Sequence, residues 1–563
     1  MKKAIPVIIA IALICVVGFV SFGSVLYEKY SYGTEYADLN EYFGNPSDDD
    51  VPIVLQDEKL ASFAKYRDGI VYFDEDLVKE LFTVRFYRDV NENLLLYTNR
   101  SDTIRTEIGS SSYLENGVSN DTEYTISYIE DDTLYIAINY IQKFVNLYYE
   151  FYEEPYRMQL YTEWGSKTVA DIKKDTCVRW RGGVKSEILR KISSGVTVEV
   201  LEVMDDWTKV KTDDAYIGYV PNDCLSDTST VEETAVTKVE AENYQNLSKD
   251  GKICLVWQNM ESEQDASFLY SACAKVEGVN VVSPTWYWLT DNDGNFTSIA
   301  NADYVKAAKN MGMEVWPLLS NFHSGTDIDI KETLSYTGKR EKLISGIIAE
   351  TLAYGATGIN VDFENIPSAA SEDYIQFIRE LCVAAHKNGL YVSVDNYVPS
   401  EYTAHYSREE QGLFADYIVI MGYDEHYAGS EPGSVSSISW MVEGIENTAE
   451  VVSKDKIINA IPFYTRVWKT SNGEVTSEAV DMSTAADFIT RNGIVTSLDD
   501  ATGQNYGEMT SGGTYYQVWM EDTYSVTTRI NVIEANGIAG VAAWALGQEI
   551  PEVWDIIEAY MEK

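Results

Sequence analysis

Two carboxylates stand at the end of an apolar stretch that has the composition of a buried strand. The segment GINVDFE, residues 358–364, alternates apolar side chains with Asn360, Asp362 and Glu364. Side chains two residues apart share one face of a strand, so these polar groups point the same way. Burying an ionised carboxylate costs several kcal/mol unless it is paired. The pattern therefore favours a cleft in which the carboxylates do acid–base chemistry, although hydrogen bonds from neighbouring strands could also satisfy them.

The elements that would position these carboxylates alternate strand and helix over residues 248–563. Helical patterns such as 339–354 and 372–387 each end at a glycine, Gly355 or Gly389. Eight β-α repeats predict an α/β fold, a (β/α)8 TIM barrel whose active site lies at the C-terminal ends of the strands. The eight strand candidates are KICLVWQ, VNVVSPTWYW, MEVWPLLS, GINVDFE, LYVSVDNY, YIVIMGY, KIINAIPFY and GIAGVAAWAL.

Two segments of this region depart from a plain barrel repeat. Residues from about 470 to 523 exceed an ordinary βα loop, and they predict a small α+β insertion after the seventh strand. The segment DNDGNF, residues 291–296, has the start of a calcium loop, but Ala302 stands where that loop needs a glutamate. A hairpin turn is the better interpretation.

Three of the strands carry motifs that resemble those of glycoside hydrolase family 18. The family motif D-G-x-D-x-D-x-E matches TGINVDFE, residues 357–364, and the motif M-x-Y-D matches MGYD, residues 421–424. The eighth strand ends AAWAL, residues 542–546, where the family keeps a tryptophan under the sugar. The longer stretch MGYDEHYAGSEPGSVSSISW is similar to the branch that includes spore-germination cortex hydrolases. The resemblance covers roughly residues 250–563.

The resemblance implies substrate-assisted hydrolysis of β-1,4 bonds beside N-acetylglucosamine, with no metal or cofactor. It implies that Glu364 protonates the leaving oxygen, that Asp362 orients the acetamido N–H, and that Tyr423, assisted by Asp424, holds the acetamido oxygen. The predicted catalytic residues are Glu364, Asp362, Tyr423 and Asp424, and the predicted substrate-binding residues are Asn360, Trp544, Met421, Trp286 and Trp316.

Structural alternatives exist for several of these residues. Tyr423 and Asp424 could bond across the strand ends, and Trp544 could belong to the barrel core. The other aromatic residues near strand ends fit a core as well as a glycan groove. These are Trp257, Trp286, Tyr287, Trp288, Trp316 and Trp468.

The fourth-strand motif departs from the family pattern at two positions. Thr357 replaces the first aspartate and Asn360 the middle one. In the family the middle aspartate exchanges a hydrogen bond and a proton with the residue at position 362. Asn360 keeps the hydrogen bond but not the charge, so we expect Asp362 to stay ionised to lower pH than in a three-acid site.

The N-terminus carries an apolar stretch of membrane-spanning length. Residues 4–23 lack charge, follow Lys2 and Lys3, and would span about 30 Å as a helix. The lysines favour a cytoplasmic N-terminus with the rest of the chain outside the membrane. The stretch is long for a signal peptide, so residues 1–30 are predicted to be an uncleaved anchor, with a cleaved signal as the alternative.

Between the anchor and the barrel the sequence predicts small β-rich modules. Residues 31–50 are polar and predict a stalk, and residues 51–165 loosely resemble the copper amine oxidase N-terminal module. Residues 166–228 look like a bacterial SH3 domain, with Gly195 in a turn and Trp207 before a strand. That resemblance implies wall-peptide binding, with a mere spacer as the alternative. Residues 229–247 read as an acidic linker.

Composition excludes some function classes. The formal charge of −46, from 43 basic and 89 acidic side chains, argues against nucleic-acid binding. The histidines lack zinc spacing. Cys177 and Cys224 could pair, whereas Cys254, Cys273 and Cys382 have apolar surroundings typical of core thiols.

The leading hypothesis is thus an extracytoplasmic glycosidase, anchored by its N-terminal helix or secreted, acting on wall polysaccharide, with peptidoglycan as the favoured polymer. Its predicted partners are peptidoglycan or a chitin-like polymer, wall peptides at the SH3-like domain, and the membrane. The alternatives are a chitinase-type N-acetylglucosaminidase and a non-catalytic glycan-binding protein on the same scaffold.

Overall fold

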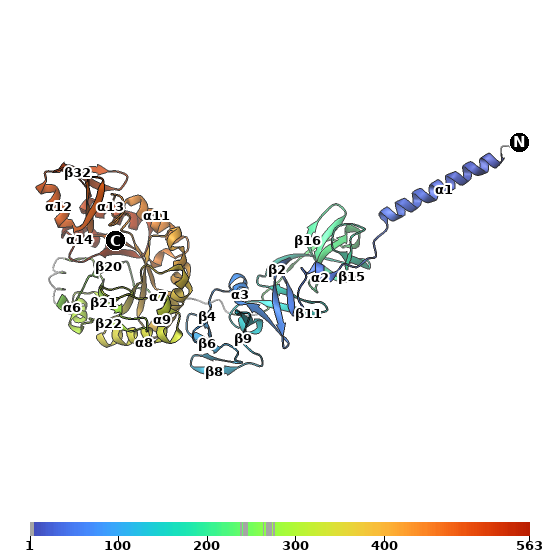
Figure 1. The fold of residues 1–563 in the computed structure, drawn as a ribbon, viewed down its shortest axis with the longest axis horizontal. Coiled ribbons are helices and arrows are strands. Elements are labelled where there is room, and N and C mark those ends of the chain that lie inside the picture. Colours follow the sequence, from blue (N-terminus) through green and yellow to red (C-terminus); the bar gives the residue numbers. More distant parts are fainter. Residues whose placement is uncertain are drawn as a thin grey trace. The chain divides into compact units, whose positions relative to one another are not determined.

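The computed structural model describes residues 5–236, 239, 246–262, 264–265, 269, 273 and 276–563. The chain forms two compact units. The first contains residues 1–86, 107–112 and 120–241, and the second contains residues 87–106, 113–119 and 242–563. Each unit has its own β-sheets and hydrophobic core, and each is described separately below (Figure 1).

The second unit contains a closed barrel of parallel strands, which confirms the predicted fold class. All eight predicted strands form, and β20 closes the barrel by pairing with both β21 and β34. Pro317 interrupts the third strand, because proline cannot donate to the ladder. In order around the barrel the strands are β20 (Ile253–Gln258), β21 (Val281–Leu289), β23 (Glu314–Val315) with β24 (Leu318–Ser320), β25 (Gly358–Asp362), β26 (Tyr391–Tyr397), β27 (Tyr417–Met421), β28 (Ile457–Pro462) and β34 (Gly540–Trp544).

Helices cover the outside of the barrel (Figure 1). The predicted helix ends are confirmed, since Gly355 has a left-handed φ of 75° directly after α8, and Gly389 has a φ of 68° just after α9. Hydrophobic residues of the strands and helices form one continuous core between them. The helices are α6 (Ala302–Asn310), α7 (Ile330–Leu334), α8 (Thr337–Tyr354), α9 (Ser371–Lys387), α10 (Arg408–Phe414), α11 (Ile438–Ala449), α13 (Thr523–Asn536) and α14 (Glu552–Met561).

The predicted insertion after the seventh strand is a small α+β layer. Its five-stranded antiparallel sheet begins at Tyr464, a little before the predicted boundary, and its order is β30-β29-β33-β32-β31. The predicted hairpin at residues 291–296 also forms, between β21 and β22 (Phe296–Ser298). The insertion contains β29 (Tyr464–Ser471), β30 (Glu474–Asp481), α12 (Met482–Arg491), β31 (Ser497–Asp499), β32 (Gln504–Ser511) and β33 (Thr514–Trp519).

Residues 87–106 belong to the barrel unit, whereas the sequence suggested one module over residues 51–165. Buried Asp89 accepts hydrogen bonds of 2.6 Å from both the backbone N–H and the hydroxyl of Thr337, and so caps the N-terminus of α8. The Tyr87 hydroxyl donates to Asp373 on α9 at 2.6 Å. These residues lie in a sheet of β4 (Phe86–Asp89), β5 (Leu94–Thr98), β6 (Thr103–Glu107), β7 (Ser112–Glu115) and β8 (Val118–Asp121).

The first unit contains two seven-stranded sheets. One has the order β11-β12-β1-β2-β3-β10-β9 and packs beside α3 (Glu75–Leu81) and α4 (Ile138–Ile141). The resemblance of this region to the copper amine oxidase N-terminal module stays a prediction. The strands are β1 (Asp50–Leu55), β2 (Glu58–Arg67), β3 (Ile70–Asp74), β9 (Ser127–Glu130), β10 (Thr133–Ala137), β11 (Tyr148–Glu153) and β12 (Tyr156–Tyr161).

The second sheet of this unit is the SH3-like module, in the order β15-β14-β18-β17-β16-β13-β19. Residues 229–232, predicted as linker, form a strand on β13. Most of the remaining predicted linker, residues 237–238 and 240–245, lies outside the described residues. The strands are β13 (Ser166–Asp171), β14 (Thr176–Arg179), β15 (Ile188–Ile192), β16 (Thr197–Val203), β17 (Trp207–Lys211), β18 (Ile217–Pro221) and β19 (Ser229–Glu232).

The predicted stalk over residues 31–50 is wrong, because this segment folds onto the SH3-like module. Tyr42 and Phe43, in and just after α2 (Leu39–Tyr42), are 3% and 5% exposed within the module's core. The Tyr42 hydroxyl donates to the Ile217 carbonyl and accepts from the Ile217 N–H. Aromatic burial of this kind gives about 1.5–3 kcal/mol per side chain, which a solvated stalk would forgo.

The N-terminal helix α1 (Ile5–Tyr30) has the length and composition to cross a membrane. Its residues 8–30 are strongly apolar, and this stretch is not buried against the rest of the chain. Cys177 and Cys224, which the sequence left open as a pair, are both free. Cys254, Cys273 and Cys382 are buried, as predicted.

Candidate active site

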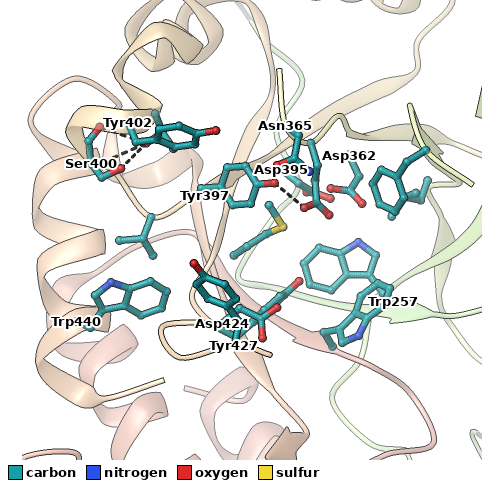
Figure 2. A pocket seen from close by; sticks show the side chains of 18 of the residues that line it. Trp257, Asp362, Asn365, Asp395, Tyr397, Ser400, Tyr402, Asp424, Tyr427 and Trp440 are labelled. Carbon is teal, nitrogen blue, oxygen red and sulfur yellow. Dashed lines mark hydrogen bonds between the residues drawn. The ribbon is translucent and has the colours of Figure 1, made fainter. Parts of the chain in front are cut away.

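A cavity of about 780 Å³ opens at the C-terminal ends of the barrel strands. It contains most of the predicted site residues, namely Asp362, Glu364, Met421, Tyr423, Asp424 and Trp544. Figure 2 shows Asp362 beside Asp395, with Tyr397 pointing toward the acidic group. The cavity wall is also aromatic, being lined by Trp257, Phe322, Tyr397, Tyr402, Tyr427, Trp440 and Tyr464.

Glu364 is held at the end of β25 by contacts with two neighbouring strand ends. The Asn321 side chain brackets its backbone, accepting from the Glu364 N–H at 2.8 Å and donating to the Glu364 carbonyl at 2.9 Å. The Tyr397 hydroxyl donates to Glu364 Oε2 at 2.6 Å. Burial, together with the charge of Asp424, raises the pKa of Glu364 despite the Tyr397 hydrogen bond, which lowers it. The carboxyl is therefore adapted to carry a proton.

Asp362 is buried and accepts no hydrogen bond from the described residues. Its Oδ1 is fully enclosed without a partner. Burial raises its pKa well above the usual range, and the charges of Asp395 and Glu364 raise it further. Native proteins rarely leave a buried acceptor unmatched, so this oxygen is suited to a donor that a ligand brings into the cavity.

Asn360 supports the site from below and does not line the cavity, which corrects its predicted role in substrate binding. The side chain is fully buried and uses its whole hydrogen-bonding capacity. Its Oδ1 accepts from Trp257 Nε1 at 2.8 Å and from Ser283 at 3.2 Å. Its Nδ2 donates to Ser393 at 2.9 Å and to Asp395 Oδ1 at 2.7 Å. Asn360 thus fixes the neighbouring acid rather than bonding to Asp362.

Asp395, on strand β26, is the acid that sequence reasoning missed. It lines the cavity, is only 2% exposed, and has a pKa raised well above the usual range by burial and by the charge of Glu364. The site therefore holds three close carboxyls although the fourth strand carries an asparagine. The expectation that Asp362 stays ionised to lower pH is wrong, because Asp395 supplies the charge that Asn360 lacks.

The motif MGYD forms the opposite side of the cavity. Gly422 is required there, because a Cβ would meet the Ala460 carbonyl at 2.5 Å. Asp424 has a left-handed φ of 61°, and its Oδ1 accepts from the Tyr464 hydroxyl at 2.6 Å. The Tyr423 hydroxyl has no hydrogen-bond partner in the described part of the chain. It is therefore available, like the Asp362 oxygen, to a group in the cavity.

Among the tryptophans predicted near the strand ends, Trp257 and Trp544 line the cavity and the others do not. Trp544 is half-buried, and its ring centre lies 5.9 Å from that of Trp257. The prediction that Trp286 and Trp316 bind substrate is wrong, because both are fully buried in the barrel and absent from the cavity wall. The sequence pattern does not distinguish these faces, since barrel strands are apolar on both. Tyr287 and Trp468 are also buried, and Trp288 stacks on His323.

Replacing Tyr397 by phenylalanine is expected to move the alkaline limb of activity to higher pH. The Tyr397 hydroxyl stabilises the ionised form of Glu364, so its removal raises the pKa of the acid and keeps it protonated longer. The measurement is a pH profile of kcat/KM on a chromogenic glycoside of N-acetylglucosamine, the sugar that the motif resemblance implies. Tyr402→Phe, on an exposed ring of the same wall, is the control. A limb that stays in place or moves to lower pH would contradict the assignment.

Asp362→Asn is expected to stabilise the barrel increasingly as pH rises. A carboxyl whose folded pKa exceeds its unfolded pKa favours folding below the unfolded value, near 3.9, and loses that contribution as pH rises through the folded pKa. Removing an unmatched buried charge is worth about 1–3 kcal/mol. Calorimetry between pH 5.5 and 8.5 should show the gap in Tm between variant and wild type widening with pH. The exposed Asp327→Asn should show no such trend, and a pH-independent gap for Asp362→Asn would refute this origin.

Comparison with known proteins identifies the family. The model of glycosyl hydrolases family 18 matches residues 243–549, more than half of the chain. The chain belongs to glycosyl hydrolase family 18. A bacterial SH3 domain model also matches residues 178–226, which confirms that prediction. The barrel is thus a family 18 glycoside hydrolase domain, and the cavity described above occupies its catalytic end.

Relatives of this family 18 protein include a glycosylase and cortical fragment-lytic enzymes. The glycosylase YvbX of Bacillus subtilis (strain 168) is 24% identical over 47% of this chain and 80% of its own. The cortical fragment-lytic enzyme of Bacillus anthracis is 26% identical over 39% of this chain and 53% of its own, so the match spans about half of that relative.

Solved structures share the fold of the family 18 domain. A chitinase from Chromobacterium violaceum ATCC 12472 has a TM-score of 0.50 at 22% identity, covering 55% of this chain and 99% of its own. The spore cortex-lytic enzyme SleL of Bacillus megaterium QM B1551 has a TM-score of 0.50 at 18% identity, covering 65% and 89%.

Proposed function

We propose that this family 18 protein cleaves β-1,4 bonds next to N-acetylglucosamine in peptidoglycan, by substrate-assisted catalysis with retention. The observation that carries the proposal is the unmatched, buried Oδ1 of Asp362 beside Glu364 in the cavity. An acetamido group has an N–H to give to that oxygen and a carbonyl oxygen to accept from the free hydroxyl of Tyr423. The cavity therefore offers one partner for each polar end of an N-acetylated sugar.

In the first step Glu364 gives its proton to the glycosidic oxygen as the bond from that oxygen to C1 breaks. The acetamido carbonyl oxygen attacks C1, forming an oxazolinium ion whose positive charge the Asp362 carboxylate stabilises. In the second step water attacks C1, the bond between C1 and the acetamido oxygen breaks to restore the acetamido group, and the Glu364 carboxylate takes the proton of the water. Two attacks on opposite faces return the original configuration, which accounts for retention.

The three close carboxyls are proposed to share protons during this cycle. Asp362 and Asp395 are both buried near Glu364, so they titrate as interacting groups and not independently. An acetamido N–H directed at Asp362 favours its ionised form. The proton then resides on Asp395, which Asn360 holds in place at 2.7 Å. Trp257 and Trp544 form the apolar wall that excludes water from this group.

Several features support a wall substrate. The N-terminal apolar helix can cross a membrane by length and composition, the SH3 match is to a bacterial domain, and relatives are named cortical fragment-lytic enzymes. We infer that the catalytic unit works outside the cytoplasmic membrane, with α1 as an anchor. Tethering would raise the local concentration of enzyme at the wall, provided that the linker is long enough to reach it.

Digestion of purified peptidoglycan and of chitin oligomers side by side, with mass spectrometry of the products, tests the proposal. Peptidoglycan fragments ending in reducing N-acetylglucosamine are expected, formed faster than chitin fragments at equal sugar concentration. Early product in the β-anomer, followed by NMR, is expected for retention. Preferential cleavage of chitin would instead indicate a chitinase, and binding without turnover of either polymer would indicate a glycan-binding protein.

A further inference from the structure

The segment that follows the apolar helix runs along the open edge of the SH3-like module. Strand β15 is the edge strand of its sheet. The Ile188 N–H of this strand donates to the Glu35 carbonyl at 2.8 Å, and the Ala37 N–H donates to the Ile188 carbonyl at 2.9 Å. Tyr36 forms a parallel bridge with Ile188. An extended segment is thus added to the sheet edge, which is a common mode of peptide binding.

The same segment also occupies the loop and aromatic surface beside that edge. The Gly33 N–H donates to the Val184 carbonyl at 2.7 Å, and the Gly33 carbonyl accepts from Arg179 Nη2 at 2.9 Å. The ring centre of Tyr32 lies 6.4 Å from that of Trp207, and the Arg179 guanidinium lies 5.2 Å from the Tyr32 ring. Residues 31–37, called here the strap, therefore engage the edge, the loop and the tryptophan together.

The strap is held more lightly than the residues that follow it. The rings of Tyr32 and Tyr36 are 54% and 58% exposed. In contrast, Asp38 caps α2, and Tyr42 lies in the module's core. The strap can consequently leave the edge while residues 38–43 keep the module folded.

We propose that this edge is the extended-peptide site of the SH3-like module and that the strap is its resident occupant. A wall peptide that binds in the same mode must displace residues 31–37. Displacement frees seven residues, which span at most about 25 Å when extended. Occupation by a wall peptide therefore also lengthens the connection between α1 and the rest of the chain. This inference does not depend on the proposed substrate of the barrel.

Hydrogen–deuterium exchange on the full chain in detergent tests the proposal. The double variant Tyr32→Ser/Gly33→Pro removes the ring contact and the N–H that binds Val184, whereas Tyr36→Ser changes an exposed ring on the same strap. Residues 34–37 and β15 are expected to exchange at least tenfold faster in the double variant than in wild type or Tyr36→Ser. Equal exchange rates in all three proteins would overturn the proposal. An unchanged melting profile of the module verifies that the double variant is folded.

Added peptides then test whether the freed edge is a peptide site. The probes are a synthetic peptide of residues 31–37 and soluble muropeptides, each at millimolar concentration. Both are expected to slow β15 exchange in the double variant, and to need at least tenfold more peptide in wild type. Equal protection in both proteins would overturn the resident role of the strap. Protection by neither probe would overturn the assignment of this edge as a peptide site.

Discussion

Glu364→Gln is expected to lower kcat/KM on N-acetylglucosamine oligomers by between about 10² and 10⁴, the usual contribution of a general acid. Glutamine keeps an oxygen that accepts from the Tyr397 hydroxyl, and the two hydrogen bonds between the Asn321 side chain and the backbone of residue 364 stay intact. The cavity therefore keeps its shape and loses only the transferable proton. Loss of kcat with KM close to wild type would show that binding survives.

A matched substitution isolates this effect. Glu409→Gln makes the same chemical change at an exposed position on α10 and should leave kcat/KM unaltered. Reducing ends released from peptidoglycan over time measure activity for both variants. An active Glu364→Gln protein would remove Glu364 from the acid role. Glycan binding without turnover in wild type as well would replace the hydrolase with a binding function.

Substitutions that remove the third acid, Asp395, from β26 or add an acid at position 360 on β25 are expected to have the second largest effect on kcat/KM. Asp395→Asn removes the group that is proposed to take the proton from Asp362. Asn360→Asp places a second carboxylate beside Asp395, at the position where Asn360 Nδ2 now lies 2.7 Å from Asp395 Oδ1. Like charges at that distance cannot both ionise. Each single variant should lose about tenfold to a hundredfold in kcat/KM. Asp395→Asn lacks the carboxyl that accepts the proton, and Asn360→Asp adds a carboxyl that must stay protonated beside Asp395.

The double variant Asn360→Asp/Asp395→Asn separates charge from position. It restores an acid–amide pair with the acid on β25, and its kcat/KM should exceed that of either single variant by at least tenfold. Because each single variant loses at least tenfold, that recovery corresponds to a coupling of at least a hundredfold, or about 2.7 kcal/mol, in a double-mutant cycle. Ser393→Ala, which removes the other Asn360 Nδ2 contact without changing charge, is the control. A double variant as poor as the product of the singles would show that Asp395 has no such role.

The main elements of the site could be predicted because they belong to single strands with strong periodicity. Asp362 and Glu364 are two residues apart, and the same spacing at the end of the fifth strand, Asp395 and Tyr397, carried an equal signal. Those two lie on a strand without a family motif, and alternation alone does not separate a cavity-lining acid from one satisfied by its neighbours. Asn321 lies just after a strand broken by proline, and nothing in its local sequence indicates a contact with Glu364.

The errors elsewhere have a common physical origin. Trp286 and Trp316 lie on strands that are covered on both faces. On such strands neither alternation nor residue type tells whether a side chain faces the barrel interior, the surrounding helices or the cavity. Residues 31–50 are polar enough to suggest a solvated tether, and only the pair Tyr42–Phe43 indicated that a hydrophobic core was near. In both cases contacts with segments distant in the sequence determine where the residues lie, and local composition does not indicate such contacts.

The attachment of residues 87–106 to the outside of the barrel limits how this enzyme can be divided. A shortened chain beginning at residue 248 would retain every proposed catalytic side chain but would leave α8 without Asp89 at its first turn. It would also uncover Arg340 and Glu380, an ion pair that Tyr87 now helps to shield from water. Recombinant production of the hydrolase domain alone should therefore start upstream of Tyr87, even though the family match begins far later in the sequence.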